Sequence, residues 1–462
     1  MVFSSIIFLF WYLPVVLAVM KLSPLKWRNA ILFVLSLIFY GWSEPFYIVL
    51  MLISTVVDYF NGRMVEKYLP DKKKARRFVI FSVVFNMGLL GFFKYADWII
   101  GMLNTLGMNL PLLGLTLPVG ISFYSFQTMS YPIDVYRGEA KAQKNIVNFG
   151  AYVVMFPQLI AGPIVRYRDI DDQLRERSET MDKFVSGIER FVCGLCKKVL
   201  LANTAGLLHT QIQSLPQNRM SAVTALLSLT GFALQIYFDF SGYSCMAIGL
   251  GRMFGFELME NFNYPYISRS ITEFWRRWHI SLSTFFRDYV YIPLGGNRKG
   301  KVRQYINIMT VWFLTGLWHG ASWNFVLWGI YFGVLLMIEK AFFKNILDKM
   351  PKFFSWLITM ILVWIGWVFF AFEDTQHIMM MFKNLTNVSN LINADTLYFM
   401  RQYGVFLIIC MISSTPWCTN VFNSMNDNVK SWLKLILVVL GMVVCTASLI
   451  NASFNPFLYF RF

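Results

Sequence analysis

The amino-acid sequence predicts an all-α polytopic membrane protein. Hydrophobic residues make up 57% of the 462-residue chain and charged residues only 14%, whereas an ordinary soluble domain carries about 25% charged residues. Apolar runs of about 20 residues recur along the chain, and a helix of that length crosses the roughly 30 Å hydrocarbon core of a bilayer. No polar linker separates these runs, so we expect residues 1–462 to form a single integral-membrane domain.

Basic residues between the apolar runs predict the topology. The net charge is +16, which in a soluble protein would suggest a nucleic-acid partner. Here the excess lies in short loops such as Asn61–Arg77, as in the cytosolic loops of membrane proteins. We therefore expect membrane lipid as a partner and no nucleic acid, with both termini outside and residues 451–462 as an external tail. The sequence predicts about ten spans: Val2–Met20, Ala30–Tyr40, Tyr47–Phe60, Phe78–Leu103, Pro118–Val135, Phe191–Ile212, Met220–Phe240, Phe353–Phe372, Tyr403–Ile412 and Trp432–Ile450.

Two further apolar segments have basic loops on both sides and are predicted to be re-entrant. Ile146–Ile164 is interrupted by Pro157 and Pro163. Gln304–Glu339 is too long for one span, and we expect a helical hairpin with its deep turn at Gly316–Ser322. Broken backbone is tolerated at membrane depth only where protein or a water-filled cavity surrounds it, so Ile146–Ile164 predicts a cavity.

His319 is the first candidate for chemistry because it lies at the predicted deep turn, between Gly316 and Gly320. An ionised side chain at membrane depth costs about 2.5–3.5 kcal/mol on insertion scales, so an ionisable residue there is a functional candidate by default. The alternative is a neutral histidine that is hydrogen-bonded to a carbonyl inside the bundle.

His279 is the second candidate. Ser270 and Glu273 fit a capping box, which predicts that a helix begins there. Apolar residues at helical spacing continue the pattern past His279 and predict one long amphipathic helix; they are Phe274, Trp278, Leu282, Phe285 and Tyr289. An interfacial helix explains this segment without any chemistry, but two histidines in one cavity could divide general-base and orienting roles.

The other polar signals are weaker. Asp239 lies late in a predicted span, where we expect it to snorkel or to form an ion pair with an arginine. The segment Gly295–Lys301 resembles a P-loop, but the next residue is Val302, so the hydroxyl ligand for Mg²⁺ is absent. Cys193 and Cys196 form a C-x-x-C without a second pair, so no metal site is predicted.

Several stretches together resemble the membrane-bound O-acyltransferase family, and in particular its bacterial branch that contains the alginate O-acetyltransferase membrane subunit. They are Phe156–Ile164, Tyr237–Gly249, Glu273–Gly300 and Gly316–Gly329. The resemblance implies a helical bundle of about ten spans, with re-entrant helices around a central funnel. It also implies that His319 and His279 are the catalytic pair. Asp239, Asn324, Arg276 and Trp318 are candidate supporting residues. Cys245 stands where the branch has an aspartate, which puts in doubt the role of an acid there.

The resemblance further implies transfer of a short acyl group, expected to be acetyl, from a cytosolic thioester to an extracytoplasmic cell-surface polysaccharide. The donor would be acetyl-CoA or a carrier-bound thioester, acting as a substrate, with no bound cofactor. The partner would be an extracytoplasmic SGNH-type acetyltransferase or a polymer synthase complex, in the bacterial plasma membrane. The C-terminal Phe457–Phe462 is similar to the end of the small partner peptide in teichoic-acid D-alanylation systems. Tyr459 is therefore a candidate acyl relay, with an aromatic interfacial anchor as the alternative.

Four other functions remain open at this point. D-alanyl transfer to teichoic acid and peptidoglycan O-acetylation share the same chemistry. A transporter that uses the histidine pair as a proton relay is a different class, but the chain lacks the internal repeat symmetry typical of transporters. A structural scaffold for a synthase complex would not need His319.

Overall fold

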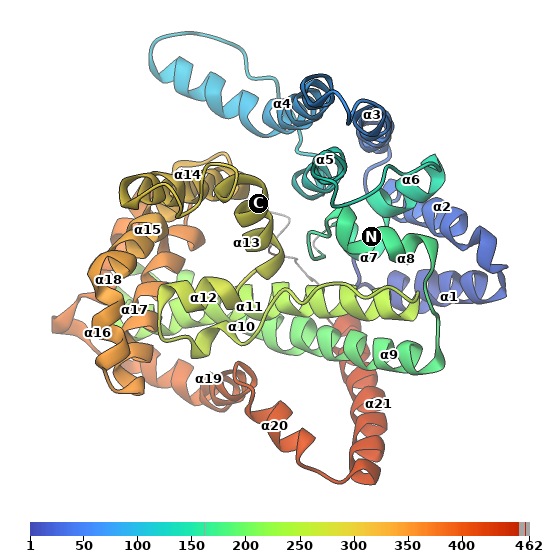
Figure 1. The fold of residues 1–462 in the computed structure, drawn as a ribbon. Coiled ribbons are helices and arrows are strands. Elements are labelled where there is room, and N and C mark those ends of the chain that lie inside the picture. Colours follow the sequence, from blue (N-terminus) through green and yellow to red (C-terminus); the bar gives the residue numbers. More distant parts are fainter. Residues whose placement is uncertain (161, 452–457, 459–462) are drawn as a thin grey trace. The chain divides into compact units, whose positions relative to one another are not determined.

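The computed structural model describes residues 1–160, 162–451 and 458, and within them every regular element is a helix. These residues form two compact units (Figure 1). Unit 1 consists of Met1–Val192 and Tyr243–Met259, and unit 2 of Cys193–Gly242 and Glu260–Phe462. The helices α9 and α11 each contribute residues to both units. The all-α prediction is therefore confirmed for the described part of the chain.

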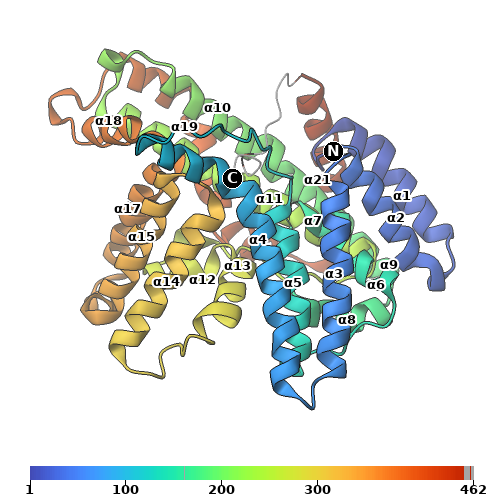
Figure 2. The ribbon, with the colours of Figure 1, turned by 90° about the horizontal axis from the view of Figure 1, so that it is seen from above.

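In unit 1, the helices α3, α4 and α5 lie side by side (Figure 2). A buried hydrogen-bond network joins them: Asp58 of α3 accepts hydrogen bonds from Ser82 and Asn86 of α4 at 2.5 and 2.6 Å, and Thr128 of α5 donates to Asn86 at 3.1 Å. A carboxylate between apolar helices is tolerable because these donors satisfy it. The helices of this unit are α1 (Leu13–Leu22), α2 (Arg28–Gly41), α3 (Ile48–Lys67), α4 (Lys72–Thr105), α5 (Ile121–Arg137), α6 (Ile146–Val154), α7 (Phe156–Leu159), α8 (Tyr167–Arg175) and the start of α9 (Met181–Cys196).

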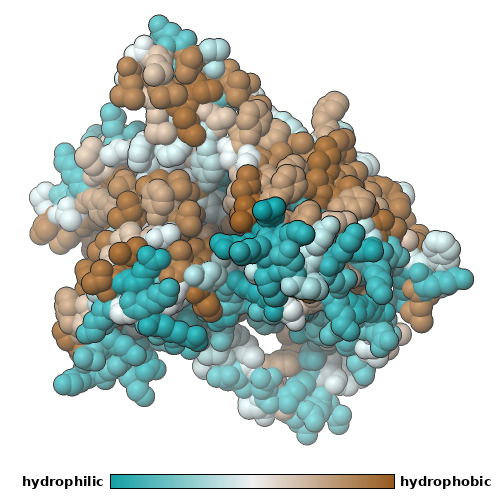
Figure 3. Space-filling model, turned by 45° about the horizontal axis from the view of Figure 1, so that its top comes forward, coloured by the Kyte–Doolittle hydropathy of each residue, from teal (hydrophilic) through white to brown (hydrophobic). Residues whose placement is uncertain are grey.

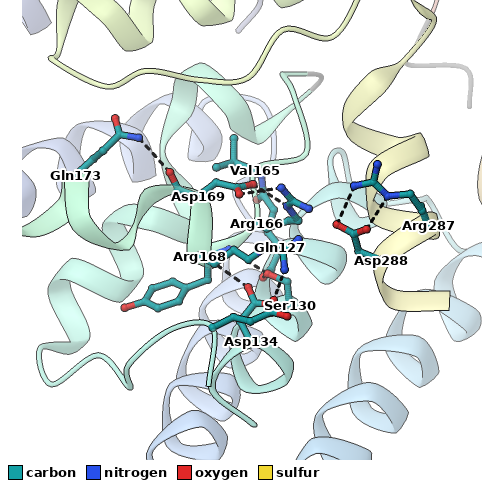
Figure 4. Close-up of polar contacts among 12 residues, drawn as sticks. Gln127, Ser130, Asp134, Val165, Arg166, Arg168, Asp169, Gln173, Arg287 and Asp288 are labelled. Carbon is teal, nitrogen blue, oxygen red and sulfur yellow. Dashed lines mark hydrogen bonds and ion pairs between the residues drawn. The ribbon is translucent and has the colours of Figure 1, made fainter. Parts of the chain in front are cut away.

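The predicted break in Ile146–Ile164 is present. Helix α6 ends at Val154, and the four-residue α7 follows after Met155, where the backbone leaves the helical region. The next helix, α8, is attached to α5 by polar contacts (Figure 4): the Tyr167 amide donates to Ser130 Oγ at 3.2 Å and the Arg168 amide to Asp134 at 3.3 Å. The basic residues after the break are therefore folded into a polar cluster of unit 1.

In unit 2, α14 and α15 form the predicted helical hairpin, and its turn at residues 320–322 lies within the predicted 316–322. The two helices approach closely at glycines, because a Cβ on Gly316 would lie 2.4 Å from the Phe325 carbonyl oxygen and one on Gly329 would lie 2.4 Å from that of Trp312. Small residues allow this kind of packing between apolar helices. The helices of this unit are α10 (Asn203–Gln213), α11 (Ala222–Met253, in part), α12 (Ile271–Arg277), α13 (Ile280–Phe286), α14 (Lys301–His319), α15 (Trp323–Ile338), α16 (Lys344–Lys349), α17 (Lys352–Ala371), α18 (Thr375–Leu385), α19 (Ala394–Ser413), α20 (Trp417–Asn423) and α21 (Asp427–Asn451).

Eight helical stretches of the described residues are long and apolar enough to cross a membrane, fewer than the ten spans expected. The helices over Val2–Met20, Ala30–Tyr40 and Pro118–Val135 form but have fewer than 18 residues. Trp323–Lys349 qualifies as a span although it was predicted as half of a re-entrant hairpin. Large apolar areas lie on the surface (Figure 3). Exposed apolar side chains include Val84 of α4 and Val443 of α21, which are 64% and 61% exposed. Such surfaces are suited to lipid rather than water.

Candidate active site

Both predicted histidines line one pocket of unit 2. The pocket has a volume of about 440 Å³ and lies among α12, α13, α14 and α15. Its walls are mainly aromatic and aliphatic, with Trp275, Trp278 and Trp312 among them. An apolar wall around two ionisable groups is typical of a ligand-binding or catalytic cavity. The structure therefore brings together two residues that are 40 positions apart in the sequence.

His319 is the last residue of α14 and is enclosed by aromatic rings. The Trp318 and Trp328 rings lie 5.0 Å from its imidazole, centroid to centroid, and the Phe370 ring lies 5.1 Å away. The rings of Trp328 and Phe370 meet the imidazole edge to face, at 81°. This surrounding excludes most water, since the side chain is buried with the residue only 6% exposed.

His279 lies at a break between two helices, which corrects the prediction of one continuous amphipathic helix. Helix α12 ends at Arg277 and α13 begins at Ile280. His279 itself has φ +46° and ψ +55°, in the left-handed region that few non-glycine residues adopt. Neither glycine nor proline marks the break in the sequence, so the periodicity of the apolar residues runs through it undisturbed.

Asn261 fixes the orientation of the His279 ring. The Asn261 side-chain oxygen lies 3.1 Å from His279 Nδ1, and it also accepts hydrogen bonds from the backbone amide of Ser281 at 3.1 Å and its hydroxyl at 2.9 Å. Because the Ser281 amide can only donate, the Asn261 atom in this position is the oxygen, and His279 Nδ1 must carry a proton to bond with it. Nε2 of the neutral ring is then the basic nitrogen.

Burial keeps His279 neutral. The residue is 2% exposed, its ring packs against Phe240 at 4.6 Å and Trp318 at 6.0 Å, and desolvation lowers its pKa to about 3. Burial disfavours the charged imidazolium because an apolar surrounding cannot solvate it. The ring therefore stays uncharged at physiological pH, with a lone pair on Nε2.

The pocket also contains cationic side chains. Arg276, Lys340 and Arg287 line it together with the histidines. Arg287 forms an ion pair with Asp288 at 2.7 Å (Figure 4). Arg276 and Lys340 have no ion pair or hydrogen bond among the residues that the structure describes. Two cations on a pocket wall, neither of them in an ion pair among the described residues, favour an anionic ligand, phosphate above all.

The remaining predicted residues lie in different places. Trp318 is in ring contact with both histidines. Asn324 donates to the Phe369 carbonyl at 3.2 Å and is not part of the pocket wall. Tyr459 lies outside the described residues. Cys245 is buried in the part of α11 that belongs to unit 1.

Asp239 forms an ion pair, with lysine in place of the expected arginine. Lys198 Nζ lies 2.8 Å from Asp239 Oδ1, and both side chains are 3% exposed. The backbone amide of Leu458 donates to the other carboxylate oxygen at 2.7 Å. Asp239 does not line the pocket, so this contact favours a structural role for it.

Reasoning from the sequence missed Asn261 and Lys340. Asn261 is an ordinary polar residue 18 positions before His279, and Lys340 belongs to a basic flank that was attributed to topology. Their proximity to the histidines depends on tertiary packing. One signal was available: Lys340 follows Glu339, an acid at the end of a long apolar run.

Comparisons with known proteins identify the family of this chain. The sequence profile of the membrane-bound O-acyltransferase family matches residues 46–382. The chain is 46% identical to the "Probable alginate O-acetylase AlgI" of Pseudomonas aeruginosa, over 81% of this chain and 73% of the relative. It is 39% identical to the protein of the same name from Pseudomonas putida, over the full length of both. It is 30% identical to the "Peptidoglycan O-acetyltransferase" of Helicobacter pylori, over 100% of this chain and 98% of the relative. The chain, a multi-pass membrane protein, therefore belongs to the membrane-bound O-acyltransferase family.

Proposed function

We propose that this protein transfers an acetyl group from a cytosolic thioester for O-acetylation of an extracytoplasmic cell-surface polysaccharide. The observation that carries the proposal is the pair of imidazoles, His279 and His319, on the wall of one apolar pocket. Acyl transfer to a hydroxyl requires a group that takes up the hydroxyl proton as the oxygen attacks the carbonyl carbon, and histidine is the usual general base.

In this reaction His319 acts as the general base. It accepts the proton of the attacking hydroxyl, the new C–O bond forms as the C–S bond breaks, and the proton returns to the departing thiolate. A positioned general base contributes roughly 10²–10⁴-fold to the rate. The aromatic surrounding of His319 supports this role, because it excludes the water that would otherwise hydrolyse the thioester.

Of the two roles expected for His279, to orient or to polarise the donor carbonyl, the hydrogen bond to Asn261 favours the orienting role. A neutral ring that donates Nδ1–H to Asn261 presents only a lone pair at Nε2, and a lone pair cannot stabilise a developing oxyanion. His279 therefore accepts a hydrogen bond, either from the attacking hydroxyl or from an amide N–H of the donor. Either contact orients a reactant beside His319.

The donor is proposed to be acetyl-CoA, acting as a substrate. Arg276 and Lys340 line the pocket and form no ion pair or hydrogen bond among the described residues, so their donors can serve a ligand. Coenzyme A carries phosphates that such cations bind through charge-assisted hydrogen bonds. A thioester on a carrier protein is the alternative donor. Its arm carries a single phosphodiester, which the same cations would bind.

The acceptor is proposed to be an alginate-like polysaccharide, because relatives at 46% and 39% identity are named as alginate O-acetylases. Peptidoglycan O-acetylation is the second candidate, on the strength of the Helicobacter pylori relative. We place the protein in the bacterial plasma membrane with both termini outside. An extracytoplasmic SGNH-type acetyltransferase or a polymer synthase complex would complete the transfer, and Tyr459 would carry the acetyl group between the two sites as an ester.

The test uses protein purified in nanodiscs with radiolabelled acetyl-CoA, comparing wild type with His319→Ala and Tyr459→Phe. Loss of thioester turnover in His319→Ala supports the general base. Loss of protein-bound label in Tyr459→Phe supports the relay, whereas unchanged label discards the relay and keeps the transferase. His377→Ala is the matched control, because this histidine is exposed on α18 and pairs with Asp374.

The same preparation separates the proposal from the other readings. If wild type does not consume acetyl-CoA but turns over a carrier-bound acyl or D-alanyl thioester, the donor is that thioester and not acetyl-CoA. A transporter would move protons or solute without consuming any thioester. A scaffold would keep its cellular function in His319→Ala.

A further inference from the structure

Glu339 is a buried acid that the proposed reaction does not use. It lies directly after α15, in the π-helical turn η7 (Glu339–Phe343), and is 3% exposed. Its carboxylate accepts hydrogen bonds from the backbone amides of Ile271 at 2.6 Å and Thr272 at 3.2 Å. These are the first two residues of α12. No ion pair to Glu339 exists among the described residues, so its hydrogen bonds come from backbone amides.

The contact with Glu339 supplies hydrogen-bond acceptors for the first N–H groups of α12. The first N–H groups of a helix have no partner within it, and a helix of seven residues such as α12 is too short to be stable alone. Ser270 Oγ caps the Glu273 amide at 3.0 Å, and Glu339 takes the two amides before it. A negative charge at the N-terminal end of a helix is also stabilising, because the helix dipole is positive there. The beginning of α12 is therefore fastened to the end of α15.

This contact connects the helix that precedes His279 with the helix that packs on α14, which carries His319. Helix α12 leads into His279 within two residues of its end, so a shift of α12 along its axis moves the His279 ring. Helix α15 packs on α14 through Gly329 and Gly316, one turn before His319. Trp275 of α12 adds packing on both partners, with ring centroids 4.7 Å from Trp312 and 4.8 Å from Phe332.

We propose that Glu339 is a positioning residue, which sets the place of α12 on the α14–α15 hairpin and so the spacing of the two imidazoles. The proposal rests on the proposed acyl transfer. Glu339 does not line the pocket, whereas its neighbour Lys340 does. Loss of the carboxylate should therefore disturb alignment for the chemical step and leave binding of the donor intact.

The test compares Glu339→Gln with the matched control Asp348→Asn, an exposed carboxylate on α16. We expect Glu339→Gln to lower kcat about tenfold or more, with donor KM within twofold of wild type, since misplacement by about 1 Å can cost 10²-fold in rate. Ser270→Ala, which removes the other cap of α12, should give the same pattern. Lys340→Gln should instead raise KM. Unchanged kcat in Glu339→Gln, with the protein fully folded by size exclusion, overturns the proposal.

A second measurement decides the question without turnover. Diethyl pyrocarbonate should modify His279 at least fivefold faster in Glu339→Gln than in wild type, while the exposed His377 reacts at the same rate in both; peptide mass spectrometry reads out each site. If wild type consumes no thioester but His279 becomes reactive, the proposed function fails and the positioning role stands. If His279 stays protected in Glu339→Gln, the positioning role is wrong. If His377 or the folded fraction also changes, the variant has merely destabilised the protein, and the proposal is wrong as stated.

Discussion

Replacing Gly316 with alanine tests whether the close packing of α14 on α15 sets the position of His319. The Cβ of an alanine would lie 2.4 Å from the backbone oxygen of Phe325, whereas ordinary van der Waals contact begins at about 3.4 Å. The obstacle is a helix carbonyl rather than the end of a flexible side chain, so the helices must separate by about 1 Å. His319 lies one turn further along α14 and moves with it.

The expected loss is much larger in activity than in stability. Overpacking costs about 1–3 kcal/mol, and alanine returns about 1 kcal/mol through its higher helix propensity. The net loss of stability is therefore about 0–2 kcal/mol, and the protein should still fold. A displacement of about 1 Å at a catalytic group lowers the rate about 10²-fold. We expect kcat for thioester turnover to fall by about that factor.

Gly404→Ala is the control, since a Cβ at this position in α19 would meet no atom within 4 Å. It should leave kcat unchanged and stability equal or slightly higher. Release of free thiol measures turnover, and thermal unfolding followed by size exclusion measures stability. If Gly316→Ala keeps kcat within twofold of wild type, the hairpin does not control the position of His319 and the reasoning is refuted.

Three further predictions concern buried polar groups. Lys198→Met or Asp239→Asn alone should lower the unfolding temperature, because each leaves an uncompensated buried charge at a cost of about 3–5 kcal/mol; the double variant should recover most of the loss. Asn261→Leu removes the acceptor for His279 Nδ1, and kcat should fall at least tenfold, part of the roughly 10²–10⁴-fold that positioned proton transfer contributes. The pKa of His279 is lowered to about 3 in the folded protein, so between pH 6.5 and 4 the unfolded chain binds a proton that the folded protein does not, and stability falls as pH falls. His279→Gln should flatten this pH dependence in thermal unfolding scans. An equally steep curve in the variant would contradict the lowered pKa of His279.

Local and compositional signals predicted most of the fold. The apolar runs located nearly every long helix, Pro157 indicated the break after α6, and the length of Gln304–Glu339 predicted the hairpin with His319 at its turn. Span number was less reliable, because an apolar run says little about where its helix ends. The helix over Pro118–Val135, for example, has 17 residues, and α11 extends well beyond its apolar run.

The parts of the site that the sequence could not reveal depend on contacts between distant residues. Glu339 caps a helix that begins 68 positions earlier, and Asp239 pairs with Lys198 on another helix. The break at His279 was missed for a similar reason: its cause is the pairing of residues 277–281 with residues 261–263, in which Ile280 donates to the Asn261 carbonyl at 3.0 Å and Asn263 donates to that of Arg277 at 2.9 Å. The sequence of residues 277–281 itself does not indicate the break.

Strained backbone conformations also occur in the segments around Asn261 and His279, and they are an argument for function. Among the described residues, Tyr264 and His279 are the non-glycine residues with positive φ, both at +46°. Each such conformation costs about 1–3 kcal/mol, and it persists only where the surrounding contacts enforce it. Tyr264 directly follows residues 261–263, and His279 lies within residues 277–281, which pair with them. The backbone and side chain of Asn261 hold Ile280, Ser281 and the imidazole of His279. A continuous α12–α13 helix would avoid the cost, but it would give up these three contacts with Asn261. The observed chain keeps the strained junction, which turns Nδ1 of a neutral histidine toward Asn261 and places the imidazole on the wall of the pocket that His319 also lines.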